Sequence, residues 1–161
     1  MRIQSIAALV PVAVLPLLLI SCGGDEQTVQ TEDGEVTVSG DDVSGSFKGE
    51  DGSTVTWGSQ NVKKPETFPQ DVFIPSDAKF SAATVFTEQE SHTLIMTSNT
   101  GAEELVALYK DEMASEGWKA GSSMDSAGGS MLGFKKGERK VNVVVAGQPP
   151  QTTVTVTTTG D

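Results

Sequence analysis

The most regular pattern of apolar and polar positions lies in residues 100–119, TGAEELVALYKDEMASEGWK. Leu105, Leu108, Tyr109 and Met113 recur there at steps of three and four residues. This spacing predicts one apolar stripe on an α-helix, because a turn takes between three and four residues. The remaining positions are mostly polar, so we expect an amphipathic helix that packs on a sheet through this stripe.

Two signals mark the ends of this helix, which we expect over residues 102–117. Thr100 and Glu103 have the S/T-x-x-E spacing of a capping box, which satisfies two free backbone amides at a helix start. Gly117 stands where a left-handed residue would end the helix. Trp118 would then fold back on the last turn in a Schellman motif.

Short runs of alternating apolar and polar residues flank the helix and predict β-strands. Two runs precede the helix and four follow it, and the turns between them are short enough for antiparallel neighbours. The expected strands are 82–88, 91–98, 119–125, 131–136, 140–146 and 152–158. We therefore expect an α+β domain over 81–161 in the order β-β-α-β-β-β-β, with its single helix packed on one face of an antiparallel sheet. Gly128-Gly129 is interpreted as a hairpin turn.

Two further segments precede this domain. Residues 35–62 hold three short alternating runs, EVTVS, VSGSF and STVTW, separated by Gly and Asp, and predict a β-rich extension. Whether these strands join the main sheet is left open. Residues 63–80 form a proline-containing connector whose Phe68, Val72, Phe73 and Ile74 are too apolar for a free linker. We expect the connector to lie against the domain.

The amino terminus has the layout of a secretory signal over 1–21, with a basic start and a long apolar run. The signal ends with Leu19-Ile20-Ser21 and is followed by Cys22. These four residues resemble the lipobox of bacterial membrane lipoproteins. The resemblance implies cleavage before Cys22 and acylation of its thiol. The alternatives are an uncleaved signal anchor, disfavoured by Pro11 and Pro16, or a chance cysteine in an ordinary secretory signal.

The resemblance also implies a location. The expected partner of acylated Cys22 is the lipid bilayer, because two or more acyl chains anchor a protein stably. Gly23, rather than Asp, follows the cysteine, and by the family's sorting rule this predicts the outer membrane, with the domain in the periplasm. The alternative is the extracellular face of a plasma membrane. Residues 22–34 carry several acids and few apolar side chains, and predict a disordered tether.

The net charge of −11 at pH 7 narrows the possible partners. Removal of 1–21 takes away Arg2 and no acid, so the charge becomes −12. An acidic protein is unsuited to nucleic acid, whose phosphates attract Lys and Arg. Repulsion from anionic headgroups favours a domain held clear of the membrane, although the charge also serves simple solubility.

Candidate catalytic and metal-binding groups are few. His92 is the only histidine, it shares strand parity with Leu94 and Met96, and we interpret it as structural. No second His or unmodified Cys remains for a zinc site, and the sequence lacks the nucleophile elbow G-x-S-x-G. The acidic turns Asp41-Asp42 and Glu50-Asp51-Gly52 lack EF-hand spacing and are interpreted as solvated. We expect no cofactor, and an enzyme is the least favoured function.

A basic cluster, Lys135, Lys136, Arg139 and Lys140, surrounds the KGER hairpin. It is a possible interaction patch for headgroups, an acidic partner or a cell-wall polymer. The competing interpretation is protection of strand ends, since lysines discourage pairing between sheet edges.

The segments FPQDVFIPSDAK, YKDEMASEGWK and LGFKKGERKVNVVV resemble a small module of uncharacterised bacterial lipoproteins. These are packing and turn features, so they imply a fold and transfer no active site. The sequence therefore predicts a monomeric, membrane-anchored envelope lipoprotein that is a non-catalytic binding or scaffolding module for an envelope protein. The alternative is a small-ligand sensor or carrier.

Overall fold

The computed structural model describes residues 26–31, 34–39, 42–58 and 62–160. Over these residues the chain forms ten β-strands, one α-helix, α1 (Ala102–Ser115), and one short 3-10 helix, η1 (Thr87–Gln89). The strands are β1 (Glu26–Thr31), β2 (Gly34–Ser39), β3 (Asp42–Lys48), β4 (Thr54–Gly58), β5 (Lys79–Phe86), β6 (Ser91–Ser98), β7 (Lys119–Ser126), β8 (Gly129–Lys136), β9 (Arg139–Gln148) and β10 (Gln151–Thr159).

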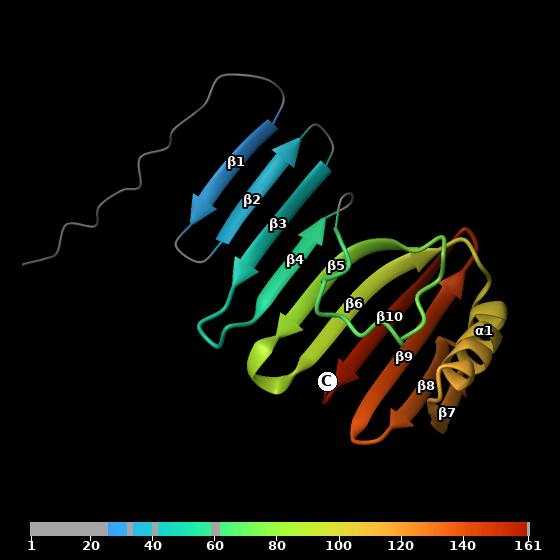
Figure 1. The fold of residues 1–161 in the computed structure, drawn as a ribbon. Coiled ribbons are helices and arrows are strands. Elements are labelled where there is room, and N and C mark those ends of the chain that lie inside the picture. The colour runs from blue at the N-terminus through green and yellow to red at the C-terminus, as the bar shows by residue number, and fades with distance from the viewer. Residues whose placement is uncertain (1–25, 32–33, 40–41, 59–61, 161) are drawn as a thin grey trace, which may run out of the picture.

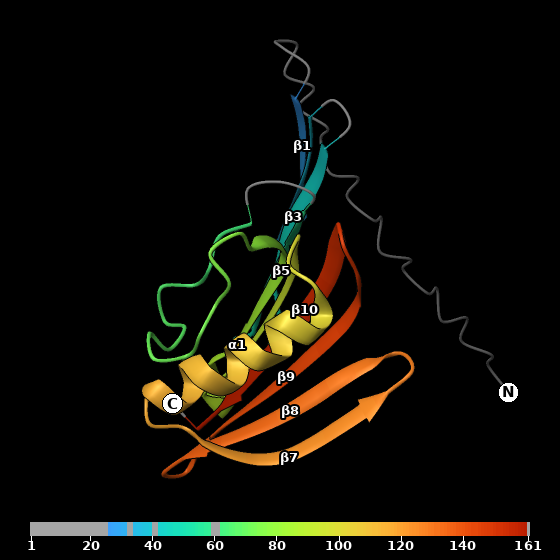
Figure 2. The same ribbon diagram turned by 90° about the vertical axis from the view of Figure 1, so that its right-hand side faces the viewer.

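The described strands form one antiparallel sheet in the order β1-β2-β3-β4-β5-β6-β10-β9-β8-β7 (Figure 1). Seen along its edge, the sheet carries α1 and the connector, residues 62–78, on the same side (Figure 2). We call this side the covered face and the other side the open face. The prediction of one helix packed on an antiparallel sheet is confirmed.

The core lies between α1 and strands β6, β8, β9 and β10. Leu105, Tyr109 and Met113 of α1 are fully buried, as the stripe predicts. Leu108, the fourth residue of the predicted stripe, is only half-buried and lies at its margin. It lies roughly 100° around the helix from Tyr109, whereas Val106 packs partly against the core from the other side.

The C-terminal end of α1 is confirmed and its N-terminal end differs from the prediction. Gly117 is left-handed, and the amide of Trp118 donates to the carbonyl of Met113 at 2.9 Å in a Schellman motif. At the other end the capping box does not form, and Gly101 is an N-cap without a side-chain hydrogen bond.

A long-range contact replaces the capping box. The Asp77 carboxylate accepts hydrogen bonds from the Ser98 hydroxyl and the Asn99 amide, both at 2.8 Å, and the Thr100 amide donates to the Ser98 hydroxyl. The segment before the helix is therefore held by the connector. A sequence motif of four residues does not reveal such a partner.

The connector lies against the domain, as expected from its apolar side chains. Phe68 and Val72 are buried with the core cluster, and Phe73 and Ile74 pack partly against it. The connector thus forms part of the layer that covers the sheet beside α1 (Figure 1).

The segment predicted as a disordered tether, 22–34, contains β1, and for residues 26–31 that prediction is corrected. All six residues of β1 pair with β2, and the hydroxyls of Thr28 and Thr37 lie 3.0 Å apart across the pair. Thr and Val suit an extended backbone. The few apolar side chains of this segment cannot offset the conformational entropy lost on ordering it, but continuous backbone pairing with β2 does.

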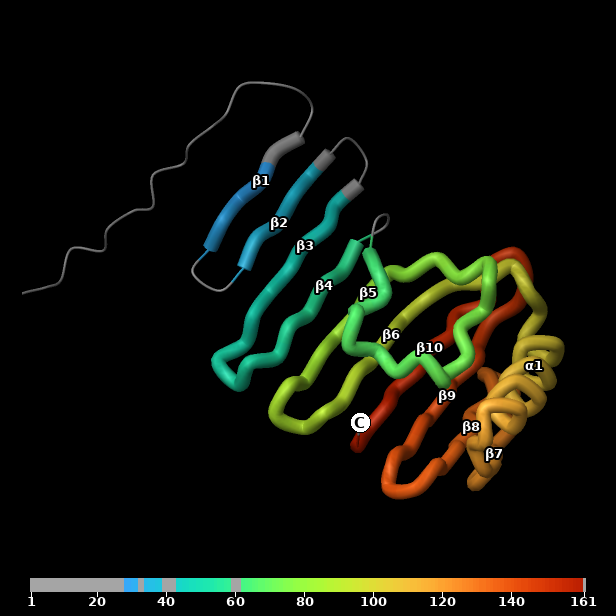
Figure 3. The backbone as a smooth tube through the Cα atoms, viewed as in Figure 1, coloured from blue at the N-terminus to red at the C-terminus, as the bar shows by residue number. Residues whose placement is uncertain are grey.

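The strands of the β-rich extension join the main sheet. β4 pairs with β5 through four residues, including Trp57 opposite Ala82, so β1 to β4 continue the sheet away from α1 (Figure 3). The predicted signal, 1–21, and Cys22 lie outside the described residues.

Candidate functional site

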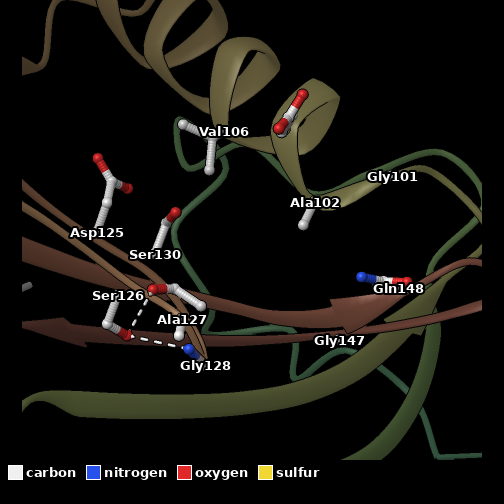
Figure 4. A pocket seen from close by; sticks show the side chains of 12 residues that line it. Gly101, Ala102, Val106, Asp125, Ser126, Ala127, Gly128, Ser130, Gly147 and Gln148 are labelled. Atoms are coloured by element: carbon white, nitrogen blue, oxygen red, sulfur yellow. Dashed lines mark hydrogen bonds between the residues drawn. The ribbon is translucent and has the colours of Figure 1, made fainter.

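A groove opens between the first turn of α1 and the β7–β8 hairpin (Figure 4). Its volume is about 900 Å³. The lining comes from the start of α1, the hairpin and the end of β9: Gly101, Ala102, Glu103, Val106, Asp125, Ser126, Ala127, Gly128, Gly129, Ser130, Gly147 and Gln148.

The β7–β8 turn is built for a close approach of backbone. The Ser126 hydroxyl donates to the Gly129 carbonyl at 3.1 Å and accepts from the Gly128 amide at 3.3 Å. Gly129 has φ 146°, and a Cβ there would collide with the carbonyl of Val145 in β9. The prediction of a glycine hairpin turn is confirmed, and the turn forms one wall of the groove.

The groove is polar and has no aromatic side chain in its lining. Glu103 and Asp125 supply carboxylates, Ser126 and Ser130 supply hydroxyls, and Gln148 supplies an amide. Such groups bind a ligand through hydrogen bonds and attract a cationic group. The groove was not predictable from the sequence, because its walls come from segments that are remote in the chain.

Below the groove, side chains fill the space between α1 and the sheet. Tyr109 packs edge-on against Phe73 with ring centroids 5.1 Å apart, and burial raises the pKa of its phenol. Its hydroxyl and that of Thr152 are buried without a hydrogen-bond partner. Val106 both lines the groove and packs partly against this core, so the groove lies at the start of α1 next to the packed core.

The predicted basic patch divides between the two faces of the sheet. Lys136 pairs with Arg139 and Lys135 pairs with Lys140 across the β8–β9 hairpin. Because direct partners share a face and successive residues alternate, the first pair lies on the covered face and the second on the open face. The four residues therefore do not form one surface.

The pair on the covered face is engaged by the connector. Two nitrogens of Arg139 donate to the two carboxylate oxygens of Asp71 at 2.9 Å, and Lys136 donates to one of them at 2.7 Å. Both cations also lie over the ring of Trp118, whose indole nitrogen donates to the Asp71 carbonyl at 2.7 Å. We call Asp71, Trp118, Lys136 and Arg139 the connector clamp.

The clamp has a clear electrostatic signature. The hydrogen bond from Arg139 lowers the pKa of Asp71 to about 2, with further help from Lys136 and against the opposing effect of burial. Asp71 lies 65 and 68 residues from its two partners, so the local sequence gave no signal for it. The clamp holds the connector to the end of α1 and to the β8–β9 hairpin.

His92 is buried beneath the connector, in agreement with its structural interpretation. Its Nε2 lies 2.9 Å from the Thr67 hydroxyl and its Nδ1 lies 3.2 Å from the Thr158 hydroxyl. The ring also packs edge-on against Phe68 at 5.8 Å. These contacts join the connector to β6 and β10 and are those of a packed residue.

The second acidic turn forms a local hydrogen bond. The Asp51 carboxylate accepts from the Ser53 amide at 3.0 Å, and hydrogen bonding to Ser53 lowers the pKa of Asp51. Asp41 lies outside the described residues. Within the described part of the chain, no group of three His, Cys, Asp or Glu residues is placed to hold a metal ion. Nor does any helix there have the length and apolar character needed to cross a membrane.

Comparison with known proteins gives one match. The profile of a family described as START domain-like matches residues 80–159, and the chain is similar to that family over this range. The range runs from β5 to β10 and includes α1, so it contains the groove and the described core cluster except Val62, Phe68 and Val72 of the connector. No curated protein and no solved structure matches the chain.

Proposed function

We propose that this protein is a membrane-anchored, non-catalytic binding module of the cell envelope, and that it binds its partner in the groove between α1 and the β7–β8 hairpin. The observation that carries the proposal is the polar groove of about 900 Å³ above a filled core. His92 contacts Thr67 and Thr158, and Asp71 forms ion pairs with Lys136 and Arg139. These contacts hold the connector to the domain, which supports a binding function over a catalytic one.

The lining of the groove favours a polar partner with a positive charge, such as a basic segment of an envelope protein. Carboxylates from α1 and β7 line the groove together with hydroxyls and glycine backbone. Asp125, Ser126 and Ser130 lie on the hairpin side of it (Figure 4). Each can accept a hydrogen bond from a Lys or Arg side chain. Val106, on the α1 side of the groove, is its largest apolar lining residue.

A small-ligand carrier or sensor is the second candidate. The START domain-like match supports it, because that description suggests a ligand-binding fold. The filled space under α1 favours a ligand bound at the surface groove over one enclosed between helix and sheet.

We also propose that the part from β5 onward, in the order β5-β6-α1-β7-β8-β9-β10, is the folding unit, and that β1 to β4 extend it. The family match begins at residue 80, within β5, which supports this division. Cys22 is then the acylated amino terminus of the mature protein and joins the extension to the bilayer. The sorting rule places this anchor in the outer membrane.

The binding site is tested by filling the groove. Val106→Trp places a large ring in it, whereas Ala107→Trp adds the same ring at an exposed neighbouring position on α1. The full-length protein is purified from cells of its host after mild crosslinking, and bound proteins and small molecules are identified by mass spectrometry. A partner that is lost with Val106→Trp and kept with Ala107→Trp supports the proposal. Equal capture by both variants contradicts it.

The anchor is tested separately. Mass spectrometry of the membrane-bound protein should find an amino-terminal, acylated Cys22, and Cys22→Ser should release the domain without unfolding it. An intact 1–21 segment or an unmodified Cys22 on the membrane-bound protein would rule the anchor out. Recovery with inner-membrane markers in a Gram-negative host would contradict only the sorting.

A further inference from the structure

The buried apolar residues of one part of the sheet and the apolar residues of the other part lie on opposite faces. From β5 to β10 the buried apolar side chains face α1 and the connector, as for Leu94 and Val154. Ile95, Met124 and Met131 of these strands are exposed on the open face. In β1 to β4 the apolar side chains lie on the open face. The register shows this directly, because Trp57 of β4 pairs with Ala82 of β5, which pairs with the half-exposed Ile95 of β6.

The open face of β1 to β4 therefore carries an apolar patch that nothing in the described structure covers. Its members are 38 to 48% exposed. They are Val29, Val38, Val43, Phe47 and Trp57, and we call them the apolar patch. On the opposite face the same strands present Thr28, Glu35, Thr37, Ser46 and Thr56.

The open face also differs from the rest of the protein in charge. Strand residues with described side chains include two carboxylates, Glu35 and Asp125, and by register both are on the covered face. The open face instead carries four lysines. These are Lys79 on β5, Lys119 on β7, Lys135 on β8 and Lys140 on β9. A protein of net charge −11 thus has one broad face without a described strand carboxylate.

We propose that the open face of β1 to β5 lies against the lipid bilayer, with the apolar patch among the headgroups. This inference rests on the proposed acylation of Cys22. Only four residue steps separate Cys22 from Glu26, the first residue of β1. A fully extended chain gains at most about 3.6 Å per residue, so the anchor keeps β1 within about 14 Å of its acyl chains. The apolar patch starts on that strand.

The charge of the face favours a bilayer over a second copy of this chain. Symmetric packing of two open faces would bring lysines toward lysines with no described strand carboxylate to pair with them. Along β1 to β5 a bilayer offers phosphate groups to Lys79 and an apolar region to Phe47 and Trp57, and Trp is well suited to that boundary. The other three lysines lie on strands beyond the docked region. The repulsion expected from the net charge acts on the covered side, where α1 carries its acids.

The protein contains a built-in probe pair for this contact, because it has two tryptophans. Trp57 belongs to the apolar patch, whereas Trp118 is 3% exposed and belongs to the connector clamp on the covered face. The mature protein, purified from the membranes of its host, is placed in vesicles of phosphatidylcholine and phosphatidylglycerol whose acyl chains are brominated. We expect bromine to quench the fluorescence of the wild-type protein, and the Trp57→Phe variant to lose this quenching.

A matched pair on β3 tests which face makes the contact. Phe47→Asp changes the open face, and Ser46→Asp adds the same charge one residue away on the covered face. Loss of one buried aromatic contact should lower the ratio of docked to undocked domain by about tenfold. Trp57 quenching should therefore fall strongly in Phe47→Asp and stay near the wild-type value in Ser46→Asp.

Each other outcome overturns the inference. If the wild-type protein floats with the vesicles but Trp57 is not quenched, the anchor stands and the docking is wrong. If Trp57 is shielded and the protein crosslinks as a dimer on the vesicles, a second copy covers the face. If the mature protein fails to float, the anchor itself is wrong and the docking falls with it. Equal loss of quenching in both β3 variants assigns the contact to something other than the open face.

Discussion

The strands β1 to β4 and the strands β5 to β10 share one sheet and are stabilised in different ways. In the second group, Leu94, Val143 and Val154 are fully buried under α1 and the connector. In the first group the apolar residues face away from that layer and stay exposed, so backbone pairing and cross-strand contacts hold the strands. Continuity of hydrogen bonding therefore does not imply continuity of the core. The layer that covers a sheet decides which face must be apolar.

The largest expected difference between the two parts comes from truncation of a core side chain. Leu105→Ala removes a fully buried side chain of α1, and such changes cost about 2–5 kcal/mol because they leave a cavity. Val43→Ala on the exposed face of β3 should change the free energy of unfolding by no more than about 0.5 kcal/mol. Urea unfolding of both variants measures the contrast, with half-buried Leu108→Ala expected between them. Equal losses at Leu105 and Val43 would mean that the extension has a core of its own.

The connector clamp should give the next largest effect. The folded state lowers the pKa of Asp71 from 3.8 to about 2, so it binds fewer protons than the unfolded state in this range. The stabilisation is complete above about pH 4 and is lost as the pH falls through about 2. We expect it to be worth about 1–2 kcal/mol, less than the full linkage value because the carboxylate is partly exposed and screened.

Asp71→Asn should remove this increment at neutral pH and flatten the fall in stability between about pH 4 and 2. Chemical unfolding at a series of pH values measures both effects. Asp51 and Asp77 also have lowered pKa values through their own hydrogen bonds, so part of the acid dependence should remain. A variant that keeps the wild-type pH profile would show that the clamp contributes nothing to folding stability.

Local features of this fold were predictable from the sequence. The spacing of Leu105, Tyr109 and Met113 revealed the buried face of α1, and Gly117 with Trp118 revealed its end. Both depend on residues that are close in the chain. The alternation of the strands and the glycine turn at Gly128 and Gly129 were predictable for the same reason.

Features that depend on long-range contacts were not predictable. Asp77 takes over the capping of the segment before α1, and Asp71 draws Lys136 and Arg139 out of the predicted basic patch. Composition suggested a tether where β1 forms, because composition does not register the backbone pairing that β2 supplies. The net charge concealed the separation of acids and lysines between the two faces.

Removal of residues 1–61 deletes β1 to β4 and should have a smaller effect on stability. The remaining chain keeps Val62, the connector, α1 and every strand from β5 onward, and so keeps the described core cluster. We expect the free energy of unfolding to fall by no more than about 1 kcal/mol, which corresponds to a fall of about 4–8 °C in melting temperature for a domain of this size. Calorimetry of the truncated and full-length proteins measures it. A truncated protein that does not fold would show that β4 is required as a partner for β5.

The smallest effect is expected at Gly45 in β3, inside the exposed part of the sheet. A Cβ on this residue would meet the indole of its cross-strand partner Trp57 at 2.6 Å, so Gly45→Ala must displace the ring. Because Trp57 is 38% exposed, the ring can move into solvent, and the free energy of unfolding should change by no more than about 0.5 kcal/mol. The fluorescence emission of Trp57 should nevertheless change, whereas that of buried Trp118 should not. The measurement compares the effect of Gly45→Ala on emission in the wild-type protein, which has both tryptophans, with its effect in the Trp57→Phe variant, which keeps only Trp118. The same substitution in the packed part of a sheet would push against buried neighbours that have no free space to move into. A large loss of stability at Gly45 would therefore show that Trp57 is a core residue and that the two parts of the sheet are less different than their burial indicates.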